Sequence, residues 1–192
     1  SLAILGAGAI GCELAQVFAR LGVRVELFEL ATRVLPNESE LASATVAQAL
    51  TQAGVRIHTG HAVREIKDGG QVVTDQGNIE CERVLVALGR QPNTDGMKLA
   101  DAKVEVDQRG FIVTDNKLRT TNKKIFAAGD CAAALQFTHH ADAQARVLVQ
   151  NALFPATAKV DGLVVPHCTY TQPEVASVGA SAEQLRASGT DY

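Results

Sequence analysis

The 192-residue sequence has no tryptophan, a single methionine and no apolar run long enough to cross a bilayer. It also lacks the charged start and short apolar centre of a secretory signal peptide. We therefore expect a cytoplasmic protein with no membrane partner. A large excess of positive charge is missing too, because the net charge is −3. This balance argues against a basic surface, so we expect no nucleic-acid partner.

Closely spaced cysteine pairs are also missing, since no CxxC or CxxxxC motif occurs. The sequence therefore predicts neither a local redox pair nor a ribbon-type zinc site. His167 and Cys168 are adjacent, and neighbouring side chains on a strand point to opposite faces, so they would chelate a metal poorly. The other pairs that we considered are His58 with His61 and His139 with His140. We predict no metal site, and reduced, packed thiols at Cys12, Cys81, Cys131 and Cys168.

A glycine-rich turn, GAGAIG, follows a short apolar strand that we expect at Leu2–Leu5. Gly6 permits a tight turn, Gly8 leaves room for a pyrophosphate, and Gly11 lets a helix approach the strand closely. The N-terminus of that helix would offer N–H groups and partial positive charge to phosphates. The sequence therefore predicts a dinucleotide site at Gly6, Gly8, Ala9, Ile10 and Gly11.

The residues after this turn repeat at helical spacing. We expect one apolar helix face, formed by Ile10, Leu14, Phe18 and Leu21, and a helix end at Gly22.

A second strand, residues 24–29, ends in an acid 18 residues after Gly11, which is close to the spacing of a ribose-binding carboxylate. Glu29, followed by Leu30, would accept hydrogen bonds from the ribose hydroxyls and repel a 2′-phosphate. We therefore favour NAD(H) over NADP as the cofactor. Two alternatives remain: Glu29 is only a solvated strand end, or Arg33 reaches a 2′-phosphate.

Strand and helix signals continue to alternate. Asn37 and Glu40 have the spacing of a capping box for a helix over residues 39–53 that Gly54 ends, and residues 55–58 follow as a strand. Residues 61–80 alternate between apolar runs and glycine turns, which predicts an antiparallel meander. Residues 84–88 predict a strand buried on both faces. Gly89, at its carboxyl end, joins the predicted nucleotide site.

With the GRQPN segment at residues 89–93, these features resemble the NAD domain of the FAD-dependent pyridine nucleotide disulfide oxidoreductases. Dihydrolipoamide dehydrogenase, glutathione reductase and mercuric reductase belong to this family. Residues 118–122 and 125–130 (LRTTN and IFAAGD) resemble its second flavin motif. The resemblance implies that an apolar strand delivers Gly129 and Asp130 to FAD, where Asp130 accepts hydrogen bonds from the ribityl chain. Taken alone, Asp130 would be interpreted as a helix cap or turn residue.

The segments QFTH at residues 136–139 and NALFP at 151–155 resemble the mercuric-reductase-like branch. They imply a helix over residues 138–153 that packs beneath the flavin and ends before Pro155. Phe137, Thr138 and His139 would then be flavin neighbours. A capping or merely packed His139 is an equal alternative.

Residues 165–179 resemble the opening strand and turn of the family's dimerisation domain, which implies a homodimer in the intact parent enzyme. Ser181 and Gln184 have the spacing of a capping box, and we expect the helix that they start to be cut off at Tyr192. Glu13 matches the glutamate that the family places near the nicotinamide carboxamide.

The resemblance thus implies an α/β fold: a Rossmann-like, doubly wound parallel sheet with an antiparallel meander, plus a partial second domain. We expect an NAD-binding domain at residues 1–93, the C-terminal part of an FAD-binding domain at 94–163 and the truncated start of a dimerisation domain at 164–192. A hydrophobic content of 46% suits one complete core and part of a second.

The family's first FAD fingerprint, its CxxxxC disulfide and its catalytic His-Glu pair are not in this sequence, which begins at Ser1 rather than methionine. We therefore expect no catalytic residue, and an isolated chain without activity. The resemblance implies a central segment of a flavin-dependent NAD(P)H:disulfide or metal-ion oxidoreductase, which binds NAD(H) and forms part of the FAD site. The alternative is a free-standing nucleotide-binding or interaction module without catalysis.

Overall fold

The computed structural model describes residues 1–133, 135–155 and 157–191. These residues form two compact units. The first combines Ser1–Gly89 with the segment that starts at Pro166, and the second is Arg90–Val165.

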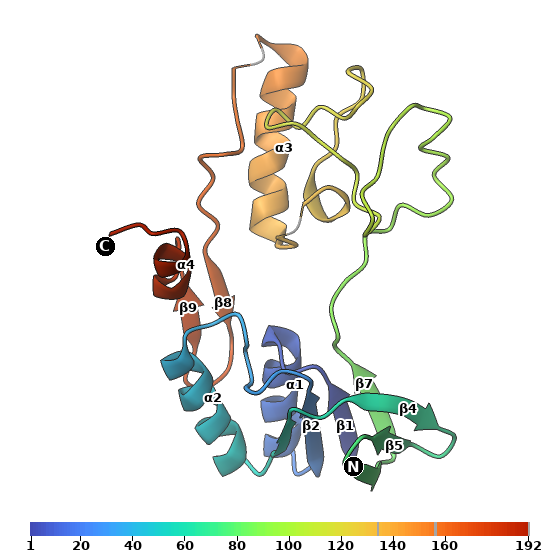
Figure 1. Ribbon diagram of the computed structural model, residues 1–192, viewed down its shortest axis with the longest axis vertical. Coiled ribbons are helices and arrows are strands. Elements are labelled where there is room, and N and C mark those ends of the chain that lie inside the picture. The colour runs from blue at the N-terminus through green and yellow to red at the C-terminus, as the bar shows by residue number, and fades with distance from the viewer. Residues whose placement is uncertain (134, 156, 192) are drawn as a thin grey trace. The chain divides into compact units, whose positions relative to one another are not determined.

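A four-stranded parallel sheet forms the centre of the first unit (Figure 1). Its strands stand in the order β3-β2-β1-β7, and their bounds are Arg56–Thr59, Val25–Glu29, Leu2–Leu5 and Arg83–Val86. Parallel strands in this order need crossover connections, which the helices α1 and α2 and the meander supply. The predicted Rossmann-like α/β fold is confirmed.

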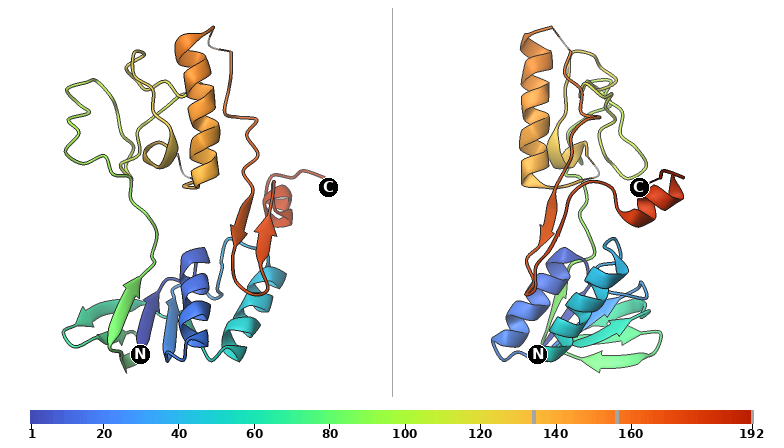
Figure 2. Two further views of the ribbon diagram at one scale, coloured as in Figure 1. Left: turned by 180° about the vertical axis from the view of Figure 1, so that it is seen from behind. Right: turned by 90° about the vertical axis from the view of Figure 1, so that its left-hand side faces the viewer.

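Alternate residues of strand β1 face two different layers of the first unit. Leu2 and Ile4 belong to a core cluster with helices α1 (Ala9–Arg20) and α2 (Glu40–Gln52). Ala3 and Leu5 belong to a second cluster with the meander. Figure 2 shows the two helices on one side of the sheet and the green meander strands on the other. The sheet is buried on both faces at β1 and β2. Strand β1 is a continuous apolar run, as such burial favours, whereas β2 also buries the charged Glu26.

The predicted meander is confirmed as a three-stranded antiparallel sheet. It consists of β4 (Val63–Lys67), β5 (Gln71–Thr74) and β6 (Gly77–Glu80). Val72, at the centre of β5, is fully buried against the central sheet.

The prediction for the buried face of α1 was partly wrong. Ile10 and Leu21 are 46% and 73% exposed, whereas the fully buried apolar positions are Cys12 and Ala15 beside Gly11. The helix begins at the glycine turn and lies too close to the sheet for large side chains at these positions, so small residues form the contact.

Two other local predictions need correction. Helix α2 is capped by Ser39, whose side chain accepts a hydrogen bond from the N–H of Ala42, and not by Asn37. Strand β7 is not buried on both faces, because it is the edge strand of its sheet and Val86 is 64% exposed. Leu88, which we expected to extend this strand, lies beyond it and is 71% exposed.

In the second unit, helix α3 (Thr138–Leu153) has the predicted bounds and packs against the short 3₁₀ helix η1 (Gly129–Cys131). The expected strand before Gly129 is not regular. Its described backbone forms only an isolated bridge between Phe126 and Arg119. A small cluster around Val104, Ile112 and Ala127 is the core here.

The segment after Pro166 belongs to the first unit. Strands β8 (His167–Thr169) and β9 (Val175–Ser177) form a hairpin, and β8 packs on α1. The predicted capping box of Ser181 and Gln184 is confirmed. Helix α4 (Ala182–Ala187) ends well before Tyr192, which lies outside the described residues, so the prediction of a cut-off helix was wrong. In the described part of the chain, no helix combines the length and apolar character needed to span a membrane.

Candidate functional site

The glycine turn lies at the carboxyl end of β1, where a parallel sheet binds ligands. Gly6 has φ +98°, and a Cβ there would lie 2.5 Å from the carbonyl oxygen of Ala87. A Cβ on Gly11 would lie 1.9 Å from the carbonyl oxygen of Gly6. Neither position can hold a side chain without moving backbone.

Gly8 differs from its two neighbours, because no atom lies within 4 Å of the place where its Cβ would be. It is the N-cap of α1 and has no side chain to accept from the N–H groups of the first turn. Ala9 and Ile10 are exposed beside it. The turn therefore leaves an open cradle in front of a helix N-terminus, which suits an anionic pyrophosphate.

Glu29 joins the carboxyl end of β2 to this turn. Its carboxylate accepts hydrogen bonds from the N–H of Ala7 at 2.7 Å and from the N–H of Ala31 at 2.9 Å. Each oxygen receives one backbone N–H, and a carboxylate oxygen has a second lone-pair direction. Glu29 can therefore hold the turn and still accept hydrogen bonds from ribose hydroxyls.

Arg33 is occupied within its own loop. Its Nη2 donates to the carbonyl oxygens of Pro36 at 3.0 Å and Glu38 at 2.9 Å, and its Nη1 lies 3.9 Å from a carboxylate oxygen of Glu40. These contacts hold its guanidinium within the loop.

The remaining predicted residues of this site lie around the same sheet edge. Leu30 follows β2 and is 71% exposed, and Gly89 follows β7 with φ +129°. Glu13, on α1, accepts a hydrogen bond from the N–H of Tyr170 at 2.8 Å. The sequence analysis missed this partner, because nothing in the spacing of the chain pairs residue 13 with residue 170.

In the second unit, Gly129 has φ +78°, which favours glycine, and a Cβ there would lie 3.2 Å from the Cβ of Ala141. The Asp130 side chain is half exposed, and one of its oxygens lies 3.5 Å from Nη1 of Arg90. Arg90 also donates to the carbonyl oxygen of Gln136 at 3.0 Å. Arg90 is a neighbour of Asp130 that the sequence analysis did not single out, although it lies in the GRQPN segment.

The three predicted residues at the start of α3 lie together. Phe137 is the N-cap, Thr138 is the first residue of the helix, and the rings of Phe137 and His139 stack with centroids 5.4 Å apart. Because α3 packs against η1, these residues and Asp130 belong to one local structure.

All four cysteines are free. Burial raises the pKa of Cys12 to about 12, and its thiol donates to the carbonyl oxygen of Ala7 at 3.3 Å. His167 bonds to the carboxylate of Glu38 at 2.9 Å. Among the described residues, no group of three or more His, Cys, Asp or Glu side chains is arranged to hold a metal ion.

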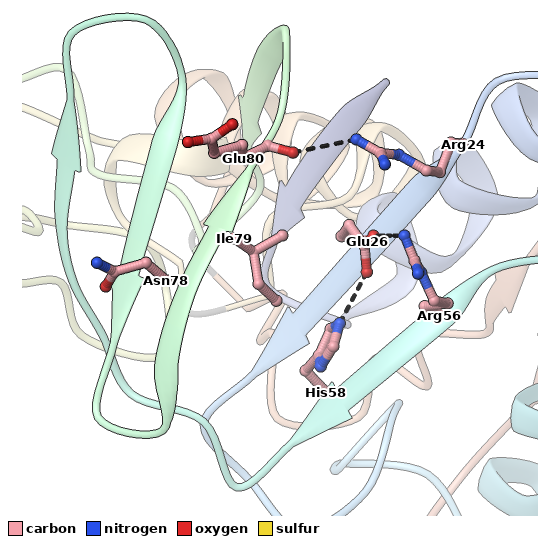
Figure 3. A pocket seen from close by; sticks show the side chains of 7 residues that line it. All are labelled: Arg24, Glu26, Arg56, His58, Asn78, Ile79 and Glu80. Carbon is pink, nitrogen blue, oxygen red and sulfur yellow. Dashed lines mark hydrogen bonds and ion pairs between the residues drawn. The ribbon is translucent and has the colours of Figure 1, made fainter.

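A cavity of about 340 Å³ lies at the amino ends of β2 and β3, away from the glycine turn (Figure 3). The Glu26 carboxylate is 2% exposed there, forms an ion pair with Arg56 and lies 2.8 Å from Nε2 of His58. Its charge is thus matched within the protein, and no predicted site residue lines the cavity. The cavity is lined by Arg24, Glu26, Arg56, His58, Asn78, Ile79 and Glu80.

Comparison with known proteins gives consistent matches. The family model described as pyridine nucleotide-disulphide oxidoreductase matches residues 1–145. Mercuric reductase of Staphylococcus aureus is 34% identical over 99% of this chain and 36% of its own length. Dihydrolipoyl dehydrogenase of Chlamydia muridarum is 38% identical over 98% of this chain and 41% of its own length.

Among solved structures, the Cu(II) complex of the HOCl-induced flavoprotein disulfide reductase RclA from Escherichia coli superposes with a TM-score of 0.91 at 34% identity. The match covers 99% of this chain and 45% of that one. The chain thus spans less than half the length of each of these relatives.

Proposed function

Because the chain belongs to the pyridine nucleotide-disulphide oxidoreductase family, we propose that its first unit binds NAD(H) and that its second unit supplies part of an FAD site. The chain would act as the central segment of a flavin-dependent NAD(P)H:disulfide or metal-ion oxidoreductase. The relatives that it matches are about twice as long or longer, so this whole-protein activity is part of the proposal.

The glycine turn with Glu29 is the observation that carries the proposal. The open space before Gly8 and the helix N-terminus behind it suit the pyrophosphate, while Glu29 fixes the turn and faces the ribose position. Ala9, Ile10 and Leu30 would line the adenosine side. Glu13 and Gly89 would lie toward the nicotinamide.

NAD(H) rather than NADP(H) is the preferred cofactor for two reasons. Glu29 would repel a 2′-phosphate, and Arg33 already donates to two backbone carbonyls in its loop. Recruiting Arg33 to a phosphate would break those hydrogen bonds.

In the second unit, Gly129 and Asp130 would meet FAD, with Phe137, Thr138 and His139 beside it. Asp130 is half exposed and retains oxygen lone pairs for ribityl hydroxyls, and Arg90 holds its carboxylate in place. When bound, the two cofactors supply the hydride transfer, which needs no side chain of this chain as acid or base. The chain's own residues bind and orient.

We also propose the domain extents of residues 1–93, 94–163 and 164–192 for the NAD-binding, FAD-binding and dimerisation domains. The hairpin β8–β9 would then be the first part of a homodimer interface domain. A cytoplasmic location is part of the same proposal.

Titration of the purified chain with NADH and NADPH, followed by fluorescence, tests the cofactor site. We expect NADH to bind and Glu29→Ala to weaken it about 10-fold or more, because the turn and the ribose lose the same carboxylate. Glu65→Ala, at an exposed position of β4, is the control and should bind as the parent does. Absence of NADH binding, or tighter binding of NADPH, would contradict the proposal.

A parallel titration with FAD tests the second unit. Asp130→Asn should weaken FAD binding in the full-length protein and leave NADH binding unchanged. NADH binding without any FAD binding in the full-length protein would instead favour a free-standing nucleotide-binding module.

A further inference from the structure

Two side chains of helix α3, Gln144 and His140, form a chain of hydrogen bonds that reaches the backbone of η1 at Gly129. The N–H of Gly129 donates to Oε1 of Gln144 at 2.7 Å. Nε2 of Gln144 lies 3.2 Å from Nε2 of His140, and Nδ1 of His140 lies 2.8 Å from the carbonyl oxygen of Leu135. Gln144 is only 5% exposed and its hydrogen bond with Gly129 is buried, so water does not substitute for Gln144 at Gly129.

The direction of each hydrogen bond follows from its two ends. A carbonyl oxygen only accepts, so Nδ1 of His140 carries a proton that points at Leu135. A backbone N–H only donates, so the Gln144 atom that faces Gly129 is the oxygen, and the amide nitrogen faces His140. Nε2 of His140 must therefore accept, and the chain of bonds is complete only with a neutral imidazole in the Nδ1–H form.

We propose that His140 and Gln144 form a positioning relay that fixes the backbone of Gly129 and thereby presents the Asp130 carboxylate to its ligand. This inference rests on the proposed role of Asp130 in the FAD site. Neither relay residue needs to touch the ligand, so both are positioning residues. The relay matters because Gly129 has a positive φ and starts a three-residue helix, which has few backbone hydrogen bonds of its own.

Protonation of His140 at Nε2 would break the hydrogen bond between His140 and Gln144. A second N–H at Nε2 would face the amide N–H₂ of Gln144, and turning that amide over would place its donors against the N–H of Gly129. The other titratable or charged groups on the elements packed here are Asp130 and Cys131 on η1 and His139, Asp142 and Arg146 on α3. Arg90 is paired with Asp130, and Arg146 is paired with Asp142. Acid pH should therefore loosen Gly129 through His140.

The first test uses Gln144→Glu, which keeps an acceptor for Gly129 but turns the other atom into an acceptor that faces His140. The variant favours a doubly protonated His140, so NMR should show its titration midpoint about one pH unit higher or more. Gln150→Glu adds the same charge to an exposed position of the same helix, about 15 Å along it from His140, and should leave the midpoint nearly unchanged. An equal response in both variants, or no response in Gln144→Glu, overturns the relay.

The second readout is amide hydrogen exchange at Gly129. We expect protection to fall about 10-fold in His140→Phe, which keeps a ring but removes both nitrogens, and to fall in the parent chain between pH 8 and pH 5. His140→Phe itself should show no such loss of protection between these pH values. Unchanged protection in His140→Phe at pH 8 counts against the proposal.

FAD affinity of the full-length protein links the relay to the site. If Asp130→Asn and His140→Phe both weaken FAD binding about 10-fold, the relay serves that site. If only Asp130→Asn weakens it, the FAD site stands and the positioning role is overturned. If neither does, the proposed FAD site itself fails, although the NMR results would still report the hydrogen bonds.

Discussion

At the scale of single residues, the three glycines of the turn meet different physical demands. Gly6 adopts a left-handed backbone and Gly11 has another carbonyl oxygen in the place of its Cβ. Gly8 has an extended backbone with φ −72° and open space in front, so folding itself does not require glycine there. The proposed pyrophosphate position would need this missing side chain instead.

Replacing these glycines with alanine should therefore separate folding from binding. Gly11→Ala should lower the free energy of unfolding by about 1–3 kcal/mol or more, because backbone must move to admit the Cβ. Gly8→Ala should lower it by no more than about 1 kcal/mol, the cost of alanine at an N-cap, but weaken NADH binding about 10-fold or more. Urea unfolding and NADH titration measure the two effects, and a Gly8→Ala chain that binds NADH normally would contradict the pyrophosphate position.

Cys12 gives a prediction about alkaline pH. Burial raises its pKa to about 12, so the folded state keeps the thiol protonated while the unfolded chain releases the proton near pH 9. The free energy of unfolding that comes from keeping this thiol protonated is fully present below about pH 9 and is lost as the pH rises toward 12. Urea unfolding at pH 8 and pH 10 should show a smaller loss in Cys12→Ala than in the parent chain. Equal losses would mean that Cys12 does not titrate differently on folding.

At the scale of elements, α1 is held on both sides. One side contacts the sheet through small residues, and the other is clasped by the loop of the hairpin β8–β9. Oε1 of the buried Gln16 accepts from the N–H of Gln172 at 2.7 Å, and Nε2 of Gln16 donates to the carbonyl oxygen of Gln172 at 3.0 Å. Arg20 also donates to the side chain of Gln172 at 2.7 Å.

Removing this clasp should destabilise the first unit. Gln16→Ala removes a buried side chain together with its two hydrogen bonds to the backbone of Gln172, which costs about 1–3 kcal/mol. Gln48→Ala, on the exposed side of α2, removes the same side chain without such bonds and should change stability by less than about 0.5 kcal/mol. Thermal unfolding of both variants measures the difference, and similar melting temperatures would show that the clasp contributes nothing.

The elements also show what the sequence can predict. The glycine turn, the meander and the capping box of Ser181 followed from local signals such as glycine spacing, alternation and caps, and helix α3 followed from the family resemblance; all were confirmed. The buried face of α1 and the exposure of β7 were not, because they depend on how closely a helix approaches the sheet and on which strand lies at its edge. Contacts between distant residues, such as Glu13 with Tyr170, leave no local signal.

In the candidate site, too, residues in local motifs could be predicted from the sequence, whereas residues that act through distant contacts could not. The residues of the proposed site, such as Gly8, Glu29 and Asp130, were singled out because each lies in a motif with a recognisable spacing. The residues that hold these site residues in place do not stand out in the sequence. Arg90 and Gln144 were missed, since an arginine or glutamine that holds a backbone group looks like any exposed polar residue until the fold brings it there.

At the scale of the whole molecule, the two units should respond separately to ligands. NADH should slow amide hydrogen exchange at residues 6–13 and 29–31, because binding stabilises only the state that forms the site. Residues 129–131 should not respond to NADH but should be protected by FAD in the full-length protein. Peptide-resolved exchange with each cofactor measures both, and protection of residues 129–131 by NADH alone would contradict the assignment of sites.

The clasp on α1 makes the first unit discontinuous in sequence. Its sheet is complete at β7, yet the loop that holds α1 lies beyond Pro166, after the whole second unit. During synthesis the glycine turn would therefore leave the ribosome long before its clasp, and α1 would remain without these contacts while residues 90–165 are made. The second unit is thus an insertion, and its length sets how long the first unit stays without its clasp.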